Sequence, residues 1–127
     1  MDVLVIYTVQ DLEDKLGGVS IRLRVLLKAE PRSAKTRDGQ EHSVVDAKVG
    51  DRTGITILSL WDEKIRQVDE GNVIDIENGY VSRFAGRLRL NIGKLGTLEK
   101  VEDPSFPSVE ELSKIRGRKY LYRRAVR

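Results

Sequence analysis

Hydrophobic and polar residues alternate with a period of two along much of the chain. From Val19 to Val25 the odd-numbered residues are aliphatic, whereas the residues between them are Ser or Arg. Because alternate side chains of a strand point to opposite faces, this pattern predicts a strand with one buried face. Similar patterns predict a second strand over Ser43–Val49 and a third over Ile55–Trp61. A fourth strand is predicted to contain Val73, Ile74, Ile76 and Val81, and a fifth to contain Leu88, Leu90 and Ile92. A last strand-like stretch covers Leu98–Val101.

Three segments are predicted to be helical. Apolar residues at positions 9, 12 and 16 predict a short helix over Thr8–Leu16, which a pair of glycines then ends. Caps and charges over Asp62–Val68 suit a single helical turn. Near the C-terminus, Ser108 and Glu111 have the spacing of a capping box ahead of apolar residues, which predicts a helix of two or three turns.

The segment Glu30–Glu41 is polar and basic, and it contains an Asp38-Gly39 pair that favours a turn. It is therefore predicted to be a loop. Five short strands joined by turns, mostly antiparallel because their connections are short, predict an all-β domain with short helices, either a small barrel or a sandwich.

The length of 127 residues suits one domain with its own core. Aromatic residues make up only 6% of the chain, so the core must be mainly Val, Ile and Leu. The net charge of +3 is unevenly distributed: residues 104–127 hold seven basic and two acidic side chains, which leaves 16 basic and 18 acidic for residues 1–103. We therefore divide the chain into a body, 1–103, and a C-terminal helix with a basic tail, 104–127. The tail either adds phosphate contacts or is simply solvated.

Several functional classes are disfavoured. Cysteine is absent, which excludes a disulfide framework and a thiolate zinc site. His42 is the only histidine and has no nucleophile motif near it, and the Gly93-Lys94 pair lacks the other residues of a phosphate loop. The apolar stretch at the N-terminus is too short for a signal peptide or a membrane span. We therefore expect no catalysis, no cofactor, no metal and no membrane partner, and a cytoplasmic protein, associated with the nucleoid in a prokaryote.

Three aromatic residues lie among cations in the second half of the body. Trp61 and Tyr80 are each expected at the end of a strand, and Phe84 follows Tyr80 closely. Aromatic residues in strands usually belong to the core. If Leu58 and Leu60 face inward, however, Trp61 must face outward, because neighbours along a strand point to opposite sides. Exposed rings among arginines can stack on the bases of a single strand while the cations meet phosphates.

A series of short motifs carries a family resemblance over about residues 8–103, and their order and spacing make it specific. The motifs are Val49-Gly50-Asp51-Arg52-Thr53-Gly54, Leu58-Ser59-Leu60-Trp61-Asp62, Glu70-Gly71-Asn72-Val73-Ile74, Ile76-Glu77-Asn78-Gly79-Tyr80-Val81, Phe84-Ala85-Gly86 and Leu88-Arg89-Leu90-Asn91-Ile92-Gly93-Lys94. The series resembles the simple single-OB-domain single-stranded DNA-binding proteins, a family that includes crenarchaeal proteins and the human SOSS-complex subunits.

The resemblance implies an OB fold, a five-stranded Greek-key barrel, followed here by the short C-terminal helix and basic tail. It also implies that Trp61, Tyr80 and Phe84 stack on bases. Some relatives carry a fourth ring where this chain has Asn91, and the outward positions before the tryptophan are Ile55 and Ile57 rather than polar residues. Polar and basic contacts to the nucleic acid are expected from Arg32, Lys35, Arg37, Lys48, Arg83, Arg87, Arg89, Asn91 and Lys94.

The sequence thus favours a monomeric protein that binds single-stranded DNA largely without sequence preference, in replication, recombination or repair. Two alternatives stay open. RNA is possible as the ligand, because stacking does not distinguish the two sugars. The second alternative is a protein assembly module, in which Ile55, Ile57 and Trp61 form the face that binds a protein partner, because a fold does not determine a function.

Overall fold

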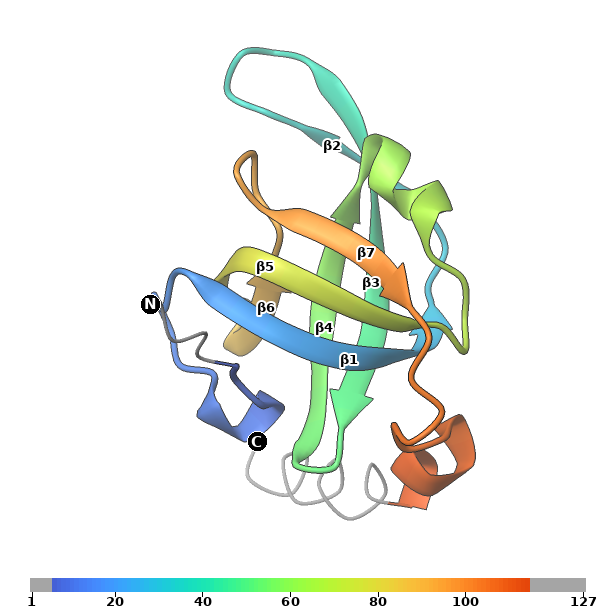
Figure 1. Ribbon diagram of the computed structural model, residues 1–127. Coiled ribbons are helices and arrows are strands. Elements are labelled where there is room, and N and C mark those ends of the chain that lie inside the picture. The colour runs from blue at the N-terminus through green and yellow to red at the C-terminus, as the bar shows by residue number, and fades with distance from the viewer. Residues whose placement is uncertain (1–5, 115–127) are drawn as a thin grey trace.

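The computed structural model describes residues 6–114, and the arginine-rich tail beyond them lies outside the described residues. Within 6–114 there are seven strands: β1 (Val19–Lys28), β2 (Arg32–Lys35), β3 (Glu41–Asp51), β4 (Gly54–Trp61), β5 (Val73–Phe84), β6 (Arg87–Asn91) and β7 (Thr97–Val101). Short 3-10 helices occupy Val9–Asp11 (η1) and Asp62–Gln67 (η2), and a helix covers 109–114. Figure 1 shows the β2–β3 hairpin at one end of the molecule and the C-terminal helix at the other.

Five of the strands close into a barrel. They follow the order β1-β3-β4-β6-β5, and β5 pairs back with β1. The β4–β6 pair is parallel and the other pairs are antiparallel. This order confirms the predicted five-stranded Greek-key barrel of an OB fold. Two strands were not part of that count: β2 extends the sheet beside β3, and β7, which was predicted as a strand-like stretch, pairs with the first half of β5.

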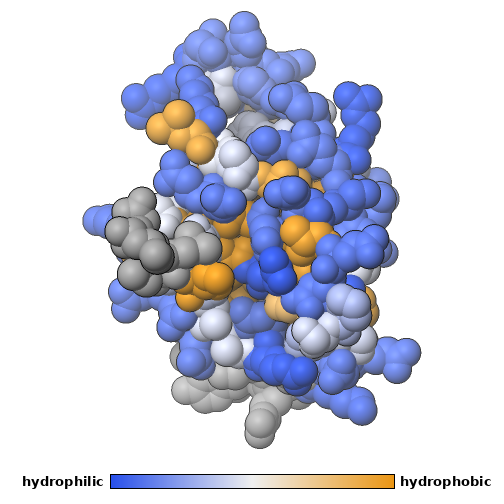
Figure 2. All heavy atoms as spheres, in the orientation of Figure 1, coloured by the Kyte–Doolittle hydropathy of each residue, from blue (hydrophilic) through white to orange (hydrophobic). Residues whose placement is uncertain are grey.

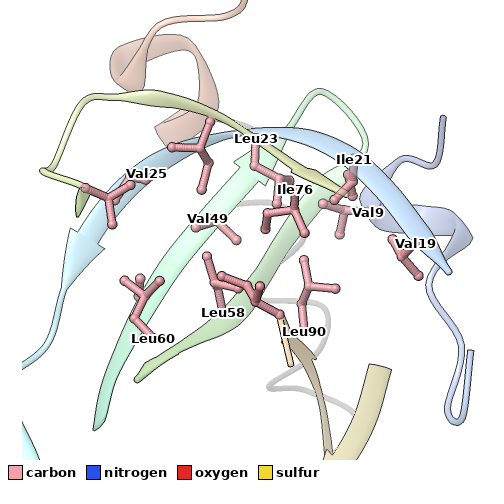
Figure 3. Close-up of a cluster of buried hydrophobic side chains, with 14 of the residues drawn as sticks. Val9, Val19, Ile21, Leu23, Val25, Val49, Leu58, Leu60, Ile76 and Leu90 are labelled. Atoms are coloured by element: carbon pink, nitrogen blue, oxygen red, sulfur yellow. The ribbon is translucent and has the colours of Figure 1, made fainter. Parts of the chain in front are cut away.

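The buried core cluster is built of aliphatic side chains, as the low aromatic content predicted, and Tyr7 packs against it from the edge. Every second residue of β1 from Val19 to Val25 is buried, and Leu58 and Leu60 of β4 are fully buried. These side chains form one cluster with residues such as Ile76 of β5 and Leu90 of β6 (Figure 3). The face shown in Figure 2 is mostly hydrophilic around a smaller apolar area near its centre, which agrees with a charged fraction of 34%.

Two predicted elements were wrong. The helix over Thr8–Leu16 is reduced to η1, because the backbone of the following residues pairs with β5: Lys15 N donates to Val81 O at 3.2 Å and Val81 N donates to Leu16 O at 2.8 Å. The loop over Glu30–Glu41 is a hairpin, in which β2 pairs with β3 around a turn at 36–40. In β2 only Ala34 is partly buried, so this strand lacks the apolar alternation that identifies a half-buried strand.

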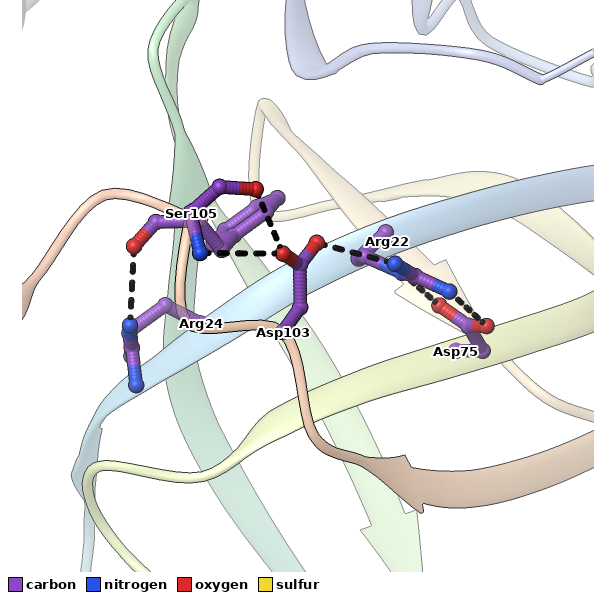
Figure 4. A network of polar contacts seen from close by, with 6 residues as sticks. Arg22, Arg24, Asp75, Asp103 and Ser105 are labelled. Atoms are coloured by element: carbon purple, nitrogen blue, oxygen red, sulfur yellow. Dashed lines mark hydrogen bonds and ion pairs between the residues drawn. The ribbon is translucent and has the colours of Figure 1, made fainter.

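The segment that follows β7 is fastened to the outer face of β1 by two arginines (Figure 4). Arg22 Nη1 donates to Asp103 at 2.9 Å while Nε and Nη2 donate to Asp75. Arg24 donates to the carbonyl oxygens of Phe106 and Pro107. The predicted capping box is present, since Glu111 N donates to the Ser108 hydroxyl and Ser108 N donates to Glu111.

The hydrogen bonds to the Asp103 carboxylate make the free energy of unfolding depend on pH in the acid range. The Ser105 hydroxyl and the Arg22 guanidinium both donate to this carboxylate and hold its pKa below the ordinary value of 3.8. A carboxylate whose pKa is lowered in the folded state stabilises the protein fully above about pH 3.9, the pKa of Asp in an unfolded chain. This contribution is lost as the pH falls through the folded-state pKa. We expect Asp103→Asn to be less stable than wild type at neutral pH and the gap to narrow below about pH 3.9. Urea unfolding across this range measures the gap, and a gap that stays constant would contradict the account.

Candidate nucleic-acid interface

Strand register brings the three predicted stacking residues onto one outer face of the barrel. Ser59 on β4 lies opposite Asn91 on β6, and Asn91 lies opposite Tyr80 on β5. Trp61 is two residues beyond Ser59 and Phe84 is four beyond Tyr80, so all these side chains point to the same side. Trp61 is 38% exposed, Tyr80 46% and Phe84 59%. The outward direction predicted for Trp61 is therefore confirmed.

Tyr80 lies within β5, which continues to Phe84, so the prediction that Tyr80 ends a strand was wrong. β5 bends at Asn78, which has a φ of 58°, and the register between β5 and β1 shifts between Val19 and Ile21. The strand resumes after this bend and includes Tyr80. The Tyr80 ring then lies against Gly93, where a Cβ would come within 2.9 Å of Tyr80 Cε1.

Trp61 is supported by a residue that sequence reasoning had considered only as a catalytic base. The His42 ring meets Trp61 edge-on, with 5.7 Å between centroids and 69° between planes. His42 Nδ1 lies 2.7 Å from Asp62 Oδ2, and Ser43 N donates to Asp62 Oδ1. The hydrogen bond with His42 is the largest cause that lowers the pKa of Asp62 below its ordinary value of 3.8, and the hydrogen bond from Ser43 N is the second. His42 therefore restrains the side of the tryptophan that faces β3.

Arg89 lies at the centre of this face and is already engaged. Its Nη1 donates to Asp46 Oδ1 at 2.5 Å and to Ser59 Oγ at 3.2 Å. Its guanidinium carbon also lies 5.0 Å from the centroid of the Phe84 ring. Arg32, from β2, donates to the same Asp46 oxygen at 3.1 Å. Asp46 was missed as a site residue, although its outward phase between Val45 and Ala47 was visible in the sequence.

Several of the other predicted polar residues share the side of the rings, whereas Lys35 and Arg83 do not. Lys35 lies opposite Glu41, one residue out of phase with His42, which contacts Trp61, so the Lys35 side chain points to the other face of the hairpin. Asn91 and Arg87 share the outer side of β6, and Lys48 has the outward phase of β3. Asn91 Nδ2 donates to Ser82 Oγ at 2.9 Å, which fixes its amide beside Tyr80. Exposed cations lie on the β2–β3 hairpin and in the β6–β7 loop, and these are Arg32, Lys35, Arg37 and Lys94.

Arg83 is turned away from the rings in the same way. It is one residue out of phase with Phe84, so it points with Val81 to the opposite side of β5. Its guanidinium lies 3.5 Å from Asp14 and donates to the Gly86 carbonyl. The expectation that Arg83 contacts phosphates beside the rings therefore conflicts with the alternation of β5.

The apolar face proposed for a protein partner is incomplete. Ile55 is only 7% exposed and packs against Gly50, where a Cβ would lie 2.5 Å from Ile55 Cδ1. Ile57 is half-buried. Of the three residues proposed for that face, only Trp61 is exposed.

The chemistry of the face is that of stacking and charge. Within 6–114 no three His, Asp or Glu side chains gather as a metal site would require, and no helix there has the length and hydropathy of a membrane span. Exposed rings separated by hydrogen-bonding groups and arginines can take up planar bases and phosphates.

Comparison with known families and structures agrees with this geometry. A family model described as single-stranded DNA binding protein Ssb-like, OB fold, matches residues 19–100. The chain is 31% identical over 104 residues to the single-stranded DNA binding protein Ssb of Saccharolobus solfataricus, covering 82% of this chain and 70% of that protein.

Two solved structures show the same fold. The replication factor A related protein of Methanobacterium thermoautotrophicum has a TM-score of 0.64 and 26% identity, with 77% of this chain and 92% of that chain covered. A replication protein A heterotrimer bound to ssDNA has a TM-score of 0.65 and 16% identity, with 81% of this chain and 26% of that chain covered.

Proposed function

Since the chain belongs to the Ssb-like family of OB-fold single-stranded DNA-binding proteins, we propose that it binds single-stranded DNA by stacking bases on Trp61, Tyr80 and Phe84. The observation that carries this proposal is the exposure of all three rings on one face of strands held in register. Every base has a π-face, so binding of this kind depends little on sequence. The proposed activity is binding without catalysis.

Phosphate contacts are proposed from cations at the edges of the aromatic face. Arg87 lies directly opposite Phe84, and the β2–β3 hairpin extends past the barrel. Such contacts release counterions, so affinity should fall with salt. The proposed set is Arg32, Lys35, Arg37, Lys48, Arg87 and Lys94, with Asn91 as a polar contact beside Tyr80.

We propose residues 1–103 as the part that binds and 104–127 as an accessory segment. The cellular role proposed is to protect or present single strands in replication, recombination or repair, as a monomer in the cytoplasm or nucleoid. The similarity to an Ssb protein and to a replication factor A related protein supports this role.

Trp61 is the only tryptophan, so its fluorescence reports stacking directly. We expect oligo(dT) to lower the fluorescence at low salt and added salt to restore it. An abasic oligomer of the same length supplies phosphates without bases and should leave the signal unchanged. If oligo(dT) also leaves it unchanged at low salt, stacking on Trp61 is wrong. Competition with an RNA oligomer of matched sequence identifies the preferred sugar, and tighter binding of RNA would make RNA the ligand.

A further inference from the structure

Asp46 is a carboxylate in the middle of a face that is proposed to bind a polyanion. Its Oδ1 accepts hydrogen bonds from two arginines that arrive from different strands, Arg89 on β6 and Arg32 on β2. Its side chain is 29% exposed, so part of the charge faces the space where DNA would lie. By charge alone, Asp46 should repel phosphates and weaken binding.

The contacts of Arg89 point to a different role. This side chain is only 17% exposed, and its guanidinium is divided between Asp46, Ser59 and the Phe84 ring. A guanidinium over an aromatic face is attracted by the ring, and a charge-assisted hydrogen bond orients it. Asp46 therefore holds the cation that supports the ring. Arg89 lies over Phe84, which is the most exposed of the three rings and the last residue of β5.

We propose that Asp46 is a positioning residue of the nucleic-acid interface. Through Arg89 it holds Phe84 in the orientation that receives a base, and through Arg32 it draws the first strand of the β2–β3 hairpin toward the same face. This inference rests on the proposed function. Its consequence is counterintuitive, because removing a negative charge from the binding face should weaken the binding of a polyanion.

The test compares two variants that change the net charge equally. Asp46→Asn and Glu99→Gln each remove one carboxylate, but Glu99 is exposed on β7, away from the rings. Affinity of the full chain for a labelled dT oligomer is measured by fluorescence polarisation at several salt concentrations. We expect Asp46→Asn to bind the oligomer about fivefold more weakly than wild type. This loss is smaller than the full loss of one stacked base, because the Phe84 ring is still present. We expect Glu99→Gln to bind at least as tightly as wild type.

A double-mutant cycle tests the route through Phe84. Asp46→Asn should cost much less affinity in a Phe84→Ala background than in wild type, and Asp46→Glu should recover part of the loss. An equal loss in both backgrounds would overturn the role assigned to Arg89 and Phe84. Affinity of Asp46→Asn equal to or above that of Glu99→Gln would overturn the whole inference. If wild type itself fails to bind the oligomer, the proposed function is wrong. This result is distinguishable from the two preceding outcomes, in both of which wild type binds.

The free protein provides a readout that does not depend on DNA. The Arg89 side chain lies over the Phe84 ring, so its NMR signals should carry a ring-current shift in wild type. We expect this shift to shrink in Asp46→Asn and to persist in Glu99→Gln. Persistence in Asp46→Asn would show that Asp46 does not hold Arg89 in place.

Discussion

Replacing Trp61 with alanine is expected to weaken binding of single-stranded DNA by about 1–3 kcal/mol, or about 5- to 150-fold. The ring makes a T-shaped contact with His42 and is 38% exposed, so it is supported on one side and open to solvent elsewhere. Stacking of a base covers the open side without moving the barrel. The loss should appear with oligomers of any sequence, since the contact involves the face of the base.

The measurement needs a reporter other than tryptophan, so a labelled oligomer and fluorescence polarisation are appropriate. Trp61→Phe is the control, because it keeps an aromatic face at the same place and should retain most of the affinity. Circular dichroism establishes that each variant is folded. A folded Trp61→Ala protein that binds as tightly as wild type would refute the stacking role.

Replacing Leu112 with alanine is expected to lower the free energy of unfolding by about 2–5 kcal/mol. Leu112 is fully buried although it lies close to the end of the described chain. The segment before it is fixed by the hydrogen bonds from Arg24 to Phe106 O and Pro107 O. Removing a buried side chain held in place by such contacts leaves a cavity that the neighbours fill only in part.

Val109→Ala is the matched control, since Val109 begins the same helix but is 36% exposed. Urea unfolding should show a much smaller change for this variant. Equal losses in the two variants would mean that the helix contributes only its own local stability. The expected difference would show that residues 104–112 stabilise the folded body, so a protein cut at the proposed division after Asp103 should be less stable.

The predictable part of the interface came from periodicity. Alternation along Ile55–Trp61 placed Leu58 and Leu60 inside and Trp61 outside, and both placements are observed. The same rule, applied to β5, predicts that Arg83 and Phe84 point to opposite faces of the strand. The predicted strand ends at Tyr80, because the left-handed backbone at Asn78, where β5 bends and continues, leaves no periodic pattern in the sequence.

Contacts between distant strands could not be predicted in this way. Asp46 and Arg89 are 43 residues apart, and they meet because β3 and β6 both lie beside β4. His42 and Trp61 meet because the hairpin of β3 and β4 has a register that puts Val44 opposite Trp61. A sequence pattern states which side of a strand a residue occupies, but it does not state which strand is next to it.

The sequence by itself determined the aliphatic core, the outward direction of Trp61, the capping box at Ser108 and Glu111, and the family. These depend on side-chain chemistry and on the local geometry of one segment, which the order of residues specifies directly. The tertiary structure alone decided that Arg24 fastens the C-terminal segment, that Arg83 is turned away from the rings and that Asp46 gathers two arginines beside Phe84. These depend on register and on the closure of the barrel, where the backbone pairing of remote strands sets the distance between side chains.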